Sequence, residues 1–253
     1  MPDEKVIELA GVTKSFAGGF FGKIPVLKGI SFTVTRGEAV GIAGPSGAGK
    51  TTLLKILLGL VKPCEGGVKL FGEKPLAALT HHVVGYVPDD HGLPPGVKVR
   101  ESVALHDGLL GLHAAGMNPA MSGRLEEALG IRDVGDARAE TVSMGTRARI
   151  AFALALKGEP SLLVLDDPFI GVDPEMRGFM RDELRGYLVR RGTLVVTSHM
   201  LLELSDVVSR VLLINGGMLA ADDSAHRVYP DVEQWYRDGT MAFRRKCATE
   251  AGT

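Results

Sequence analysis

The sequence predicts an α/β protein with a mainly parallel sheet, an N-terminal antiparallel β region and an inserted helical subdomain. Strands and helices alternate after about residue 140, which is typical of parallel sheets with crossover helices. The residues before the first glycine-rich loop have the composition of strands. From about residue 98 to 140 the pattern becomes helical, with glycine and asparagine breaks, and this stretch is expected to form the helical subdomain.

Composition excludes several classes of protein. The chain has 253 residues, 45% of them hydrophobic and 23% charged, which excludes disorder and suffices for one large domain with a subdomain. The net charge of −1 gives no reason to expect a nucleic-acid partner. Cys64 and Cys247 lack the spacing of a metal or disulfide motif, so free thiols in a reducing compartment are expected.

The protein is expected to stay in the cytosol. No run reaches 18 apolar residues, and the first residues hold two acids without the apolar centre of a secretion signal. Contact with a membrane would then require a partner protein.

The elements can be placed in order along the chain. The first half predicts strands and one helix, ending in a proline-rich loop: Val6–Leu9, Ile30–Val34, Ala39–Ala43, the helix Lys50–Leu60, Val83–Val87 and the loop Pro88–Pro95. The second half predicts helix and strand in turn: Ile150–Leu156, Leu162–Leu165, Pro174–Arg190, Leu194–Thr197, Leu201–Ser205 and Val211–Ile214. The main domain is expected to span residues 1–228, followed by a polar C-terminal tail (229–253) that can form a short helix.

A glycine-rich loop between the strand Ala39–Ala43 and the following helix carries the strongest signal. It matches G-x-x-x-x-G-K-[ST] at every fixed position: Gly44, Pro45, Ser46, Gly47, Ala48, Gly49, Lys50 and Thr51, with Thr52 next. Its backbone N–H groups and the helix N-terminus can surround phosphate oxygens. Lys50 can reach the β- and γ-phosphates, and the Thr51 hydroxyl can ligate Mg²⁺. The sequence therefore predicts a nucleotide site with ATP and Mg²⁺.

A second carboxylate site follows the apolar strand Leu162–Leu165. Asp166 and Asp167 stand at its end, where a carboxylate that organises Mg²⁺ is expected. Successive strand side chains face opposite sides, so Asp166 is assigned to Mg²⁺ and Asp167 to the attacking water. A solvated Asp-Asp-Pro turn is the alternative.

Together with later segments, these residues resemble the ATP-binding subunits of ABC transporters, over roughly Val6 to Asp222. The stretch Val142–Arg147 stands at the place of that family's Leu-Ser-Gly-Gly-Gln signature, and its Ser143 and Gly145 match. The resemblance implies that this helix end contacts the γ-phosphate held by a second subunit. An ordinary helix capped by Ser143 is the alternative.

Three further residues match positions of the family. Asp173, in Gly171-Val172-Asp173-Pro174, would lie on the loop that crosses the dimer interface, although these residues also suit a helix start. His199 matches the switch histidine, which would contact the γ-phosphate and the attacking water. Phe16 stands where an aromatic side chain stacks on adenine, with core packing as the alternative.

Two residues depart from the family pattern. Asp167 replaces the usual glutamate, which retracts the carboxylate by roughly 1.5 Å. A misplacement of about 1 Å can cost ~10²-fold in rate, so hydrolysis is expected to be slow unless the backbone compensates. Asp89 replaces the usual glutamine; it would ligate Mg²⁺ as a hard anion, with a solvated loop acid as the alternative.

The resemblance implies an ATP-hydrolysing subunit that powers a separate transmembrane permease subunit, with export as the expected direction. It also implies a head-to-tail homodimer that closes on ATP, and a place on the inner face of the cell membrane through the permease. A nucleotide-gated regulatory or scaffolding subunit with little turnover is the alternative, motivated by Asp167 and Asp89. A soluble ABC ATPase without a transporter is a third reading.

Overall fold

An antiparallel sheet of three strands forms the N-terminal part of the chain. The strands are β1 (Lys5–Ala17), β2 (Lys23–Thr35) and β4 (Glu65–Leu70), in the order β2-β1-β4. Leu9 of β1 lies opposite Phe32 of β2, and both side chains are buried. The computed structural model describes residues 4–18, 22–112, 119–199 and 201–250. The chain forms two compact units, residues 1–80 with 193–253 and residues 81–192.

The first unit holds a second set of strands that positions the glycine-rich loop. These are β3 (Ala39–Ala43), β7 (Thr193–Thr197), β8 (Arg210–Asn215) and β9 (Met218–Ser224). Strand β3 is parallel to both β7 and β8, and β9 is antiparallel to β8. Every residue of β3 and β7 is buried, as their continuous apolar runs predict. The mainly parallel arrangement expected from the sequence is confirmed for these strands.

Helices surround these strands in the first unit. They are α1 (Lys50–Leu57), α2 (Pro75–His81), the 3₁₀ turn η3 (Leu201–Leu204), α7 (Ala225–Val228), η4 (Tyr229–Asp231) and α8 (Val232–Glu250). Helix α1 follows β3 through the glycine-rich loop, and its predicted start at Lys50 is confirmed.

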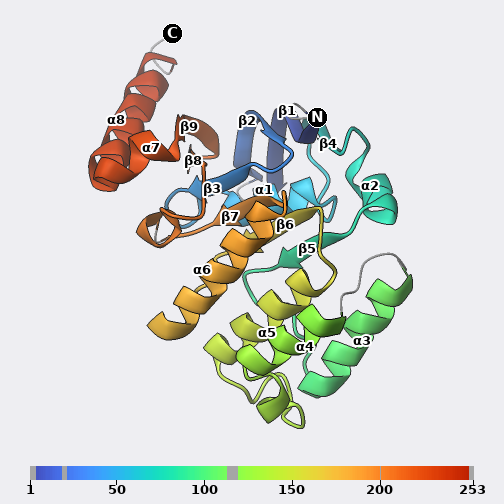
Figure 1. Cartoon of the computed structure of the whole chain (residues 1–253). Coiled ribbons are helices and arrows are strands. Elements are labelled where there is room, and N and C mark those ends of the chain that lie inside the picture. The colour runs from blue at the N-terminus through green and yellow to red at the C-terminus, as the bar shows by residue number, and fades with distance from the viewer. Residues whose placement is uncertain (1–3, 19–21, 113–118, 200, 251–253) are drawn as a thin grey trace. The chain divides into compact units, whose positions relative to one another are not determined.

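The C-terminal helix α8 runs for 19 residues, where the sequence suggests a polar tail. It lies beside β8 and β9 (Figure 1). A β-carbon on Gly239 would lie 2.6 Å from Leu213 Cδ2, so the helix backbone approaches β8 closely. The Trp235 indole donates a hydrogen bond to Asp223 of β9 at 2.9 Å. These contacts hold a helix whose own sequence is largely polar.

The second unit combines two parallel strands with a group of helices. Its elements are β5 (Val84–Val87), α3 (Val99–Leu112), α4 (Pro119–Ala128), η2 (Arg132–Val134), α5 (Met144–Lys157), β6 (Leu162–Asp166) and α6 (Pro174–Val189). Figure 1 shows α3, α4 and α5 gathered together, in green to yellow.

A buried lysine ties these three helices together. The ammonium group of Lys157 on α5 has no exposed surface and lies 2.8 Å from Asp107 on α3 and 2.6 Å from Glu126 on α4. Burying a charge is costly unless it is paired, and here two carboxylates face it. Among the helices of the described residues, none combines the length and apolarity that crossing a lipid bilayer needs.

Candidate functional site

Two glycines of the glycine-rich loop occupy positions where the β-carbon of any other residue would clash. A β-carbon on Gly44 would lie 2.2 Å from the carbonyl oxygen of Ile214 on β8. Gly49 caps α1 with φ of 102°, in the left-handed region, and its β-carbon would meet Leu27 at 2.7 Å. The backbone therefore turns tightly between β3 and α1, and it closes one turn by the Ala48 N–H donating to the Pro45 oxygen at 3.1 Å.

Lys50 is buried in this loop and binds the loop's own carbonyls. Its ammonium group donates to the Gly44 oxygen at 2.8 Å and the Pro45 oxygen at 3.2 Å. The first turn of α1 holds no acidic side chain, so the positive end of the helix dipole is not neutralised there. Thr51 is half-buried beside Lys50. A cationic side chain, a helix N-terminus and a hydroxyl thus lie together, which suits a nucleotide phosphate with Mg²⁺.

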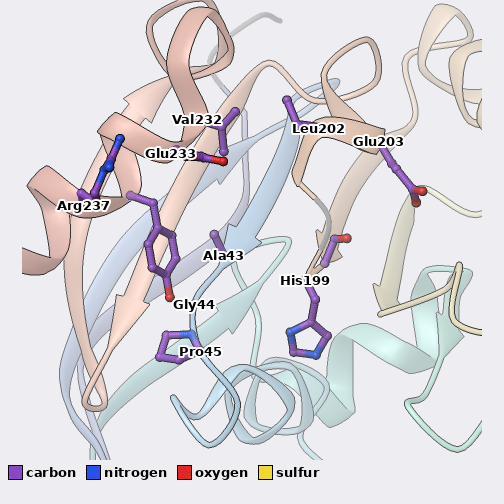
Figure 2. A pocket seen from close by; sticks show the side chains of 11 residues that line it. Ala43, Gly44, Pro45, His199, Leu202, Glu203, Val232, Glu233 and Arg237 are labelled. Carbon is purple, nitrogen blue, oxygen red and sulfur yellow. The ribbon is translucent and has the colours of Figure 1, made fainter.

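His199 lies at the end of β7, on the same unit as the loop. The N–H of the preceding Ser198 donates to the Ile42 carbonyl of β3 at 3.4 Å, so the ends of the two strands are adjacent. His199, Gly44 and Pro45 all line one pocket of about 590 Å³ (Figure 2). The structure therefore brings the predicted switch histidine and the start of the phosphate loop to the same pocket.

Phe16 is not a core residue. Its side chain is 42% exposed near the end of β1, which rules out the core-packing alternative. The Lys14 ammonium lies 5.0 Å from the centre of its ring, in cation–π distance. An exposed aromatic ring of this kind can stack on a purine base.

The second unit carries the predicted carboxylates. Asp166 ends β6 with no exposed surface, which rules out a solvated turn for this residue. Burial raises the pKa of Tyr86, and the negative charges of Asp166, Asp89 and Asp90 raise it further. Of the two carboxylates assigned to Mg²⁺ here, Asp166 is buried and Asp89 is exposed, as a loop acid would be.

Asp167 adopts a left-handed backbone conformation, with φ of 48°. Among residues with a side chain, aspartate and asparagine adopt this region most readily. The departure from glutamate at this position thus matches the local backbone.

The signature segment begins α5 as predicted. Ser143 caps the helix, and its hydroxyl accepts a hydrogen bond from the Thr146 N–H at 3.1 Å. Gly145 is buried against the next loop, since its β-carbon would lie 2.2 Å from the Gly171 carbonyl oxygen. The cap alone would suit an ordinary helix, but the close contact fixes the helix start against the segment that holds Asp173.

Asp173 caps α6. Its carboxylate accepts a hydrogen bond from the Met176 N–H at 2.9 Å, and Pro174 occupies the first turn. The helix-start reading of this segment is therefore confirmed, and its exposed Asp173 stays available as an interface residue.

Sequence reasoning missed three polar side chains that line a second, smaller pocket of about 160 Å³ in the second unit. Within the described residues, the Tyr86 hydroxyl and the Nδ1 atoms of His91 and His106 are buried without a hydrogen-bonding partner. Burial lowers the pKa of both histidines. No spacing in the sequence links these residues, because they come from a strand, a loop and a helix.

Comparisons with known proteins agree with this geometry. The family described as ABC transporter matches residues 27–170. "Nod factor export ATP-binding protein I" of Burkholderia lata is 37% identical over 209 residues, covering 81% of this chain and 68% of that protein. The protein of the same name from Paraburkholderia xenovorans is 36% identical over 253 residues, covering 97% and 81%.

Solved structures share the fold. An ATP-binding subunit of an ABC transporter superposes with a TM-score of 0.78 at 20% identity, covering 93% of this chain and 99% of that one. The dimeric structure of MJ0796, a bacterial ABC transporter cassette, gives a TM-score of 0.76 at 24% identity, covering 87% and 98%. At these identities the structures show a shared fold alone. The family match and the relatives cover most of the chain and show the family. The chain therefore belongs to the ABC transporter family, as one of its ATP-binding subunits.

Proposed function

We propose that this chain hydrolyses ATP to power export through a separate transmembrane subunit. The observation that carries the proposal is the phosphate loop, in which Lys50 is buried at the N-terminus of α1 and bound to the Gly44 and Pro45 carbonyls. The relatives described above are named for export, which supports this direction of transport. The reaction converts ATP and water to ADP and phosphate.

Binding of ATP would use the phosphate loop, Phe16 and the residues assigned to Mg²⁺. Loop N–H groups and Lys50 would hold the phosphates, and Phe16 would stack on the adenine. Mg²⁺ would be held by the Thr51 hydroxyl together with Asp166 and Asp89, and would neutralise phosphate charge. Lys50 would exchange its bonds to the loop carbonyls for bonds to phosphate oxygens.

Hydrolysis would depend on Asp167 and His199. Asp167 would accept a hydrogen bond from the attacking water and orient it, while His199 would contact the γ-phosphate. The left-handed backbone at Asp167 alters the direction of its carboxylate, and this compensates for the shorter side chain.

A second copy of the chain would complete the site. Ser143 and Gly145 stand at a helix N-terminus, and Asp173 lies on the segment packed against it. In a head-to-tail dimer these residues would face the ATP of the other copy. The transmembrane partner would hold the dimer at the membrane. The alternative of a scaffold with little turnover is not favoured, because the relatives are named as export ATP-binding proteins.

Mg-ATP hydrolysis by the purified chain, measured against protein concentration, tests this proposal. A rate that rises faster than linearly is expected for a working dimer. Lys50→Ala should abolish it, while the matched variant Lys55→Ala, five residues further along α1, should retain it. Activity that survives both Lys50→Ala and His199→Ala would refute the assignment of the site.

Co-purification with a membrane protein encoded beside the chain tests the partner. Stimulation of ATP hydrolysis by that protein in lipid vesicles is the expected result. Hydrolysis that proceeds at full rate alone and never responds to a membrane protein would favour a soluble ATPase.

A further inference from the structure

The pocket that His199 shares with the phosphate loop extends beyond the positions assigned to phosphate, toward α8. From the loop it takes only Gly44 and Pro45; Lys50 and Thr51 are not in its wall. Its opposite wall is the start of α8 (Figure 2). Its volume of about 590 Å³ falls within the range of small-molecule sites, which is roughly 300–1,000 Å³.

The wall of this pocket is mostly apolar, with a few polar groups. Its apolar side chains include Leu202 of η3 and Val232 and Tyr236 of α8. Pockets of this composition bury the apolar body of a ligand and use single polar groups to orient it. An organic molecule with an apolar body is therefore a better match than an inorganic ion.

Two charged side chains of α8 distinguish the ligand further. Glu233 and Arg237 are four residues apart, a spacing at which opposite charges usually pair on a helix. Within the described part of the chain, however, neither has a hydrogen bond or an ion pair. Figure 2 shows the Glu233 carboxylate turned toward the wall with Leu202 and the Arg237 guanidinium turned away from it.

The remaining acid of the wall is Glu203, which is less exposed than Glu233. Glu203 already interacts with other groups of the protein. Glu233 is exposed and is the acid of this wall without a partner among the described residues, and a carboxylate binds an ammonium group by a charge-assisted hydrogen bond.

From this arrangement we propose that the pocket binds a small amphipathic amine. The apolar body lies against Leu202, Val232 and Tyr236, and the ammonium group binds Glu233. Because Gly44 and His199 share the wall, occupancy changes the affinity for ATP, and ATP changes the affinity for the amine by the same factor. This role goes beyond ATP hydrolysis and can be tested without turnover.

The chain carries its own reporter for the experiment. Trp235 is the single tryptophan of the sequence and neighbours Tyr236 on α8. The full-length protein is titrated with 4-phenylbutylamine, and the fluorescence of Trp235 is followed. 4-Phenylbutyrate and 4-phenylbutanol, which share the apolar body, serve as matched probes. The amine is expected to saturate and to bind about tenfold more tightly than the carboxylate.

Variants separate the pocket from the rest of the surface. Glu233→Gln should remove the preference for the amine. Asp238→Asn is the matched control, because Asp238 lies on the same helix but bonds Gln234 outside the pocket wall. Leu202→Arg, which fills the pocket from the exposed side, should abolish binding of all three probes.

Several outcomes would overturn the proposal. Equal affinity for the three probes, preference for the carboxylate, or an amine preference that survives Glu233→Gln would each remove Glu233 as the recognition group. Amine binding that survives Leu202→Arg would place the site elsewhere. An amine affinity that is identical with and without Mg-ATP would refute the coupling to the phosphate loop.

Discussion

Gly145 of the signature segment lies directly against Gly171, at the loop before α6. A β-carbon on Gly145 would come within 2.2 Å of the Gly171 carbonyl oxygen, a distance that real β-carbons do not reach. The N-terminus of α5 and the segment that presents Asp173 are therefore held by backbone contact. A change in one of them must displace the other.

Gly145→Ala should slow ATP hydrolysis at least tenfold while leaving ATP binding to the isolated chain unchanged. The added methyl group pushes α5 off the Gly171 loop, and a misplacement of about 1 Å is sufficient for a loss of ~10²-fold. Hydrolysis rate and equilibrium ATP binding are measured side by side. Gly178→Ala is the control, because a β-carbon there has no atom within 4 Å. Equal rates for the two variants would contradict the prediction.

Asp167 variants should separate backbone preference from chemistry. Asp167→Asn keeps a residue that tolerates φ of 48°, so the free energy of unfolding should change by less than ~0.5 kcal/mol while hydrolysis is lost. Asp167→Glu should lower the free energy of unfolding by about 1 kcal/mol, because glutamate adopts the left-handed region less readily. Denaturant unfolding measures both. A glutamate variant as stable as the wild type would contradict the argument from the backbone.

Lys157→Met should destabilise the second unit by about 2–3 kcal/mol. The substitution leaves Asp107 and Glu126 facing each other without their cation, and the solvent exposure of these two carboxylates keeps the loss below that of a fully buried pair. Lys69→Met, on the exposed side of β4, is the matched control and should change stability by no more than ~0.5 kcal/mol. A similar loss in both variants would show that the buried ion pairs are not its cause.

Stability should fall as the pH drops below about 6.5, in part because of His106. Burial is the main cause that lowers its pKa; Asp107 opposes this effect and Lys157 adds to it. The unfolded chain then takes up a proton at a pH where the folded protein does not, so acid favours unfolding. His106→Asn should flatten the fall in Tm between pH 7.5 and 5.5. The exposed His226→Asn is the control, and an equal flattening there would contradict the assignment.

The sequence predicts best what a short stretch of chain determines by itself. The path from β3 through Gly44–Thr51 to α1 could be placed because strand, turn and helix signals follow one another without a break. The helix caps Ser143 and Asp173 could also be predicted from the sequence, because each accepts a hydrogen bond from the N–H three residues ahead.

Contacts between distant segments could not be read in this way. Strand β4 opens Glu65-Gly66-Gly67, a composition typical of turns, yet Gly66 is needed because its β-carbon would lie 2.5 Å from the Ala10 carbonyl. Helix α8 looks like a polar tail because its close contact with β8 falls at Gly239, a glycine that gives no hydrophobic signal. The meeting of Tyr86, His91 and His106 depends on packing that no periodicity records.

The phosphate loop and the C-terminal helix share a single support. Gly44 abuts the Ile214 carbonyl and Gly239 abuts the Leu213 side chain, so two consecutive residues of β8 bear the loop at one point and the helix at the other. A force on the C-terminus, from a fusion tag, a tether or a docking protein, would therefore reach the phosphate loop through Leu213 and Ile214. For this protein a C-terminal attachment is therefore not a neutral choice.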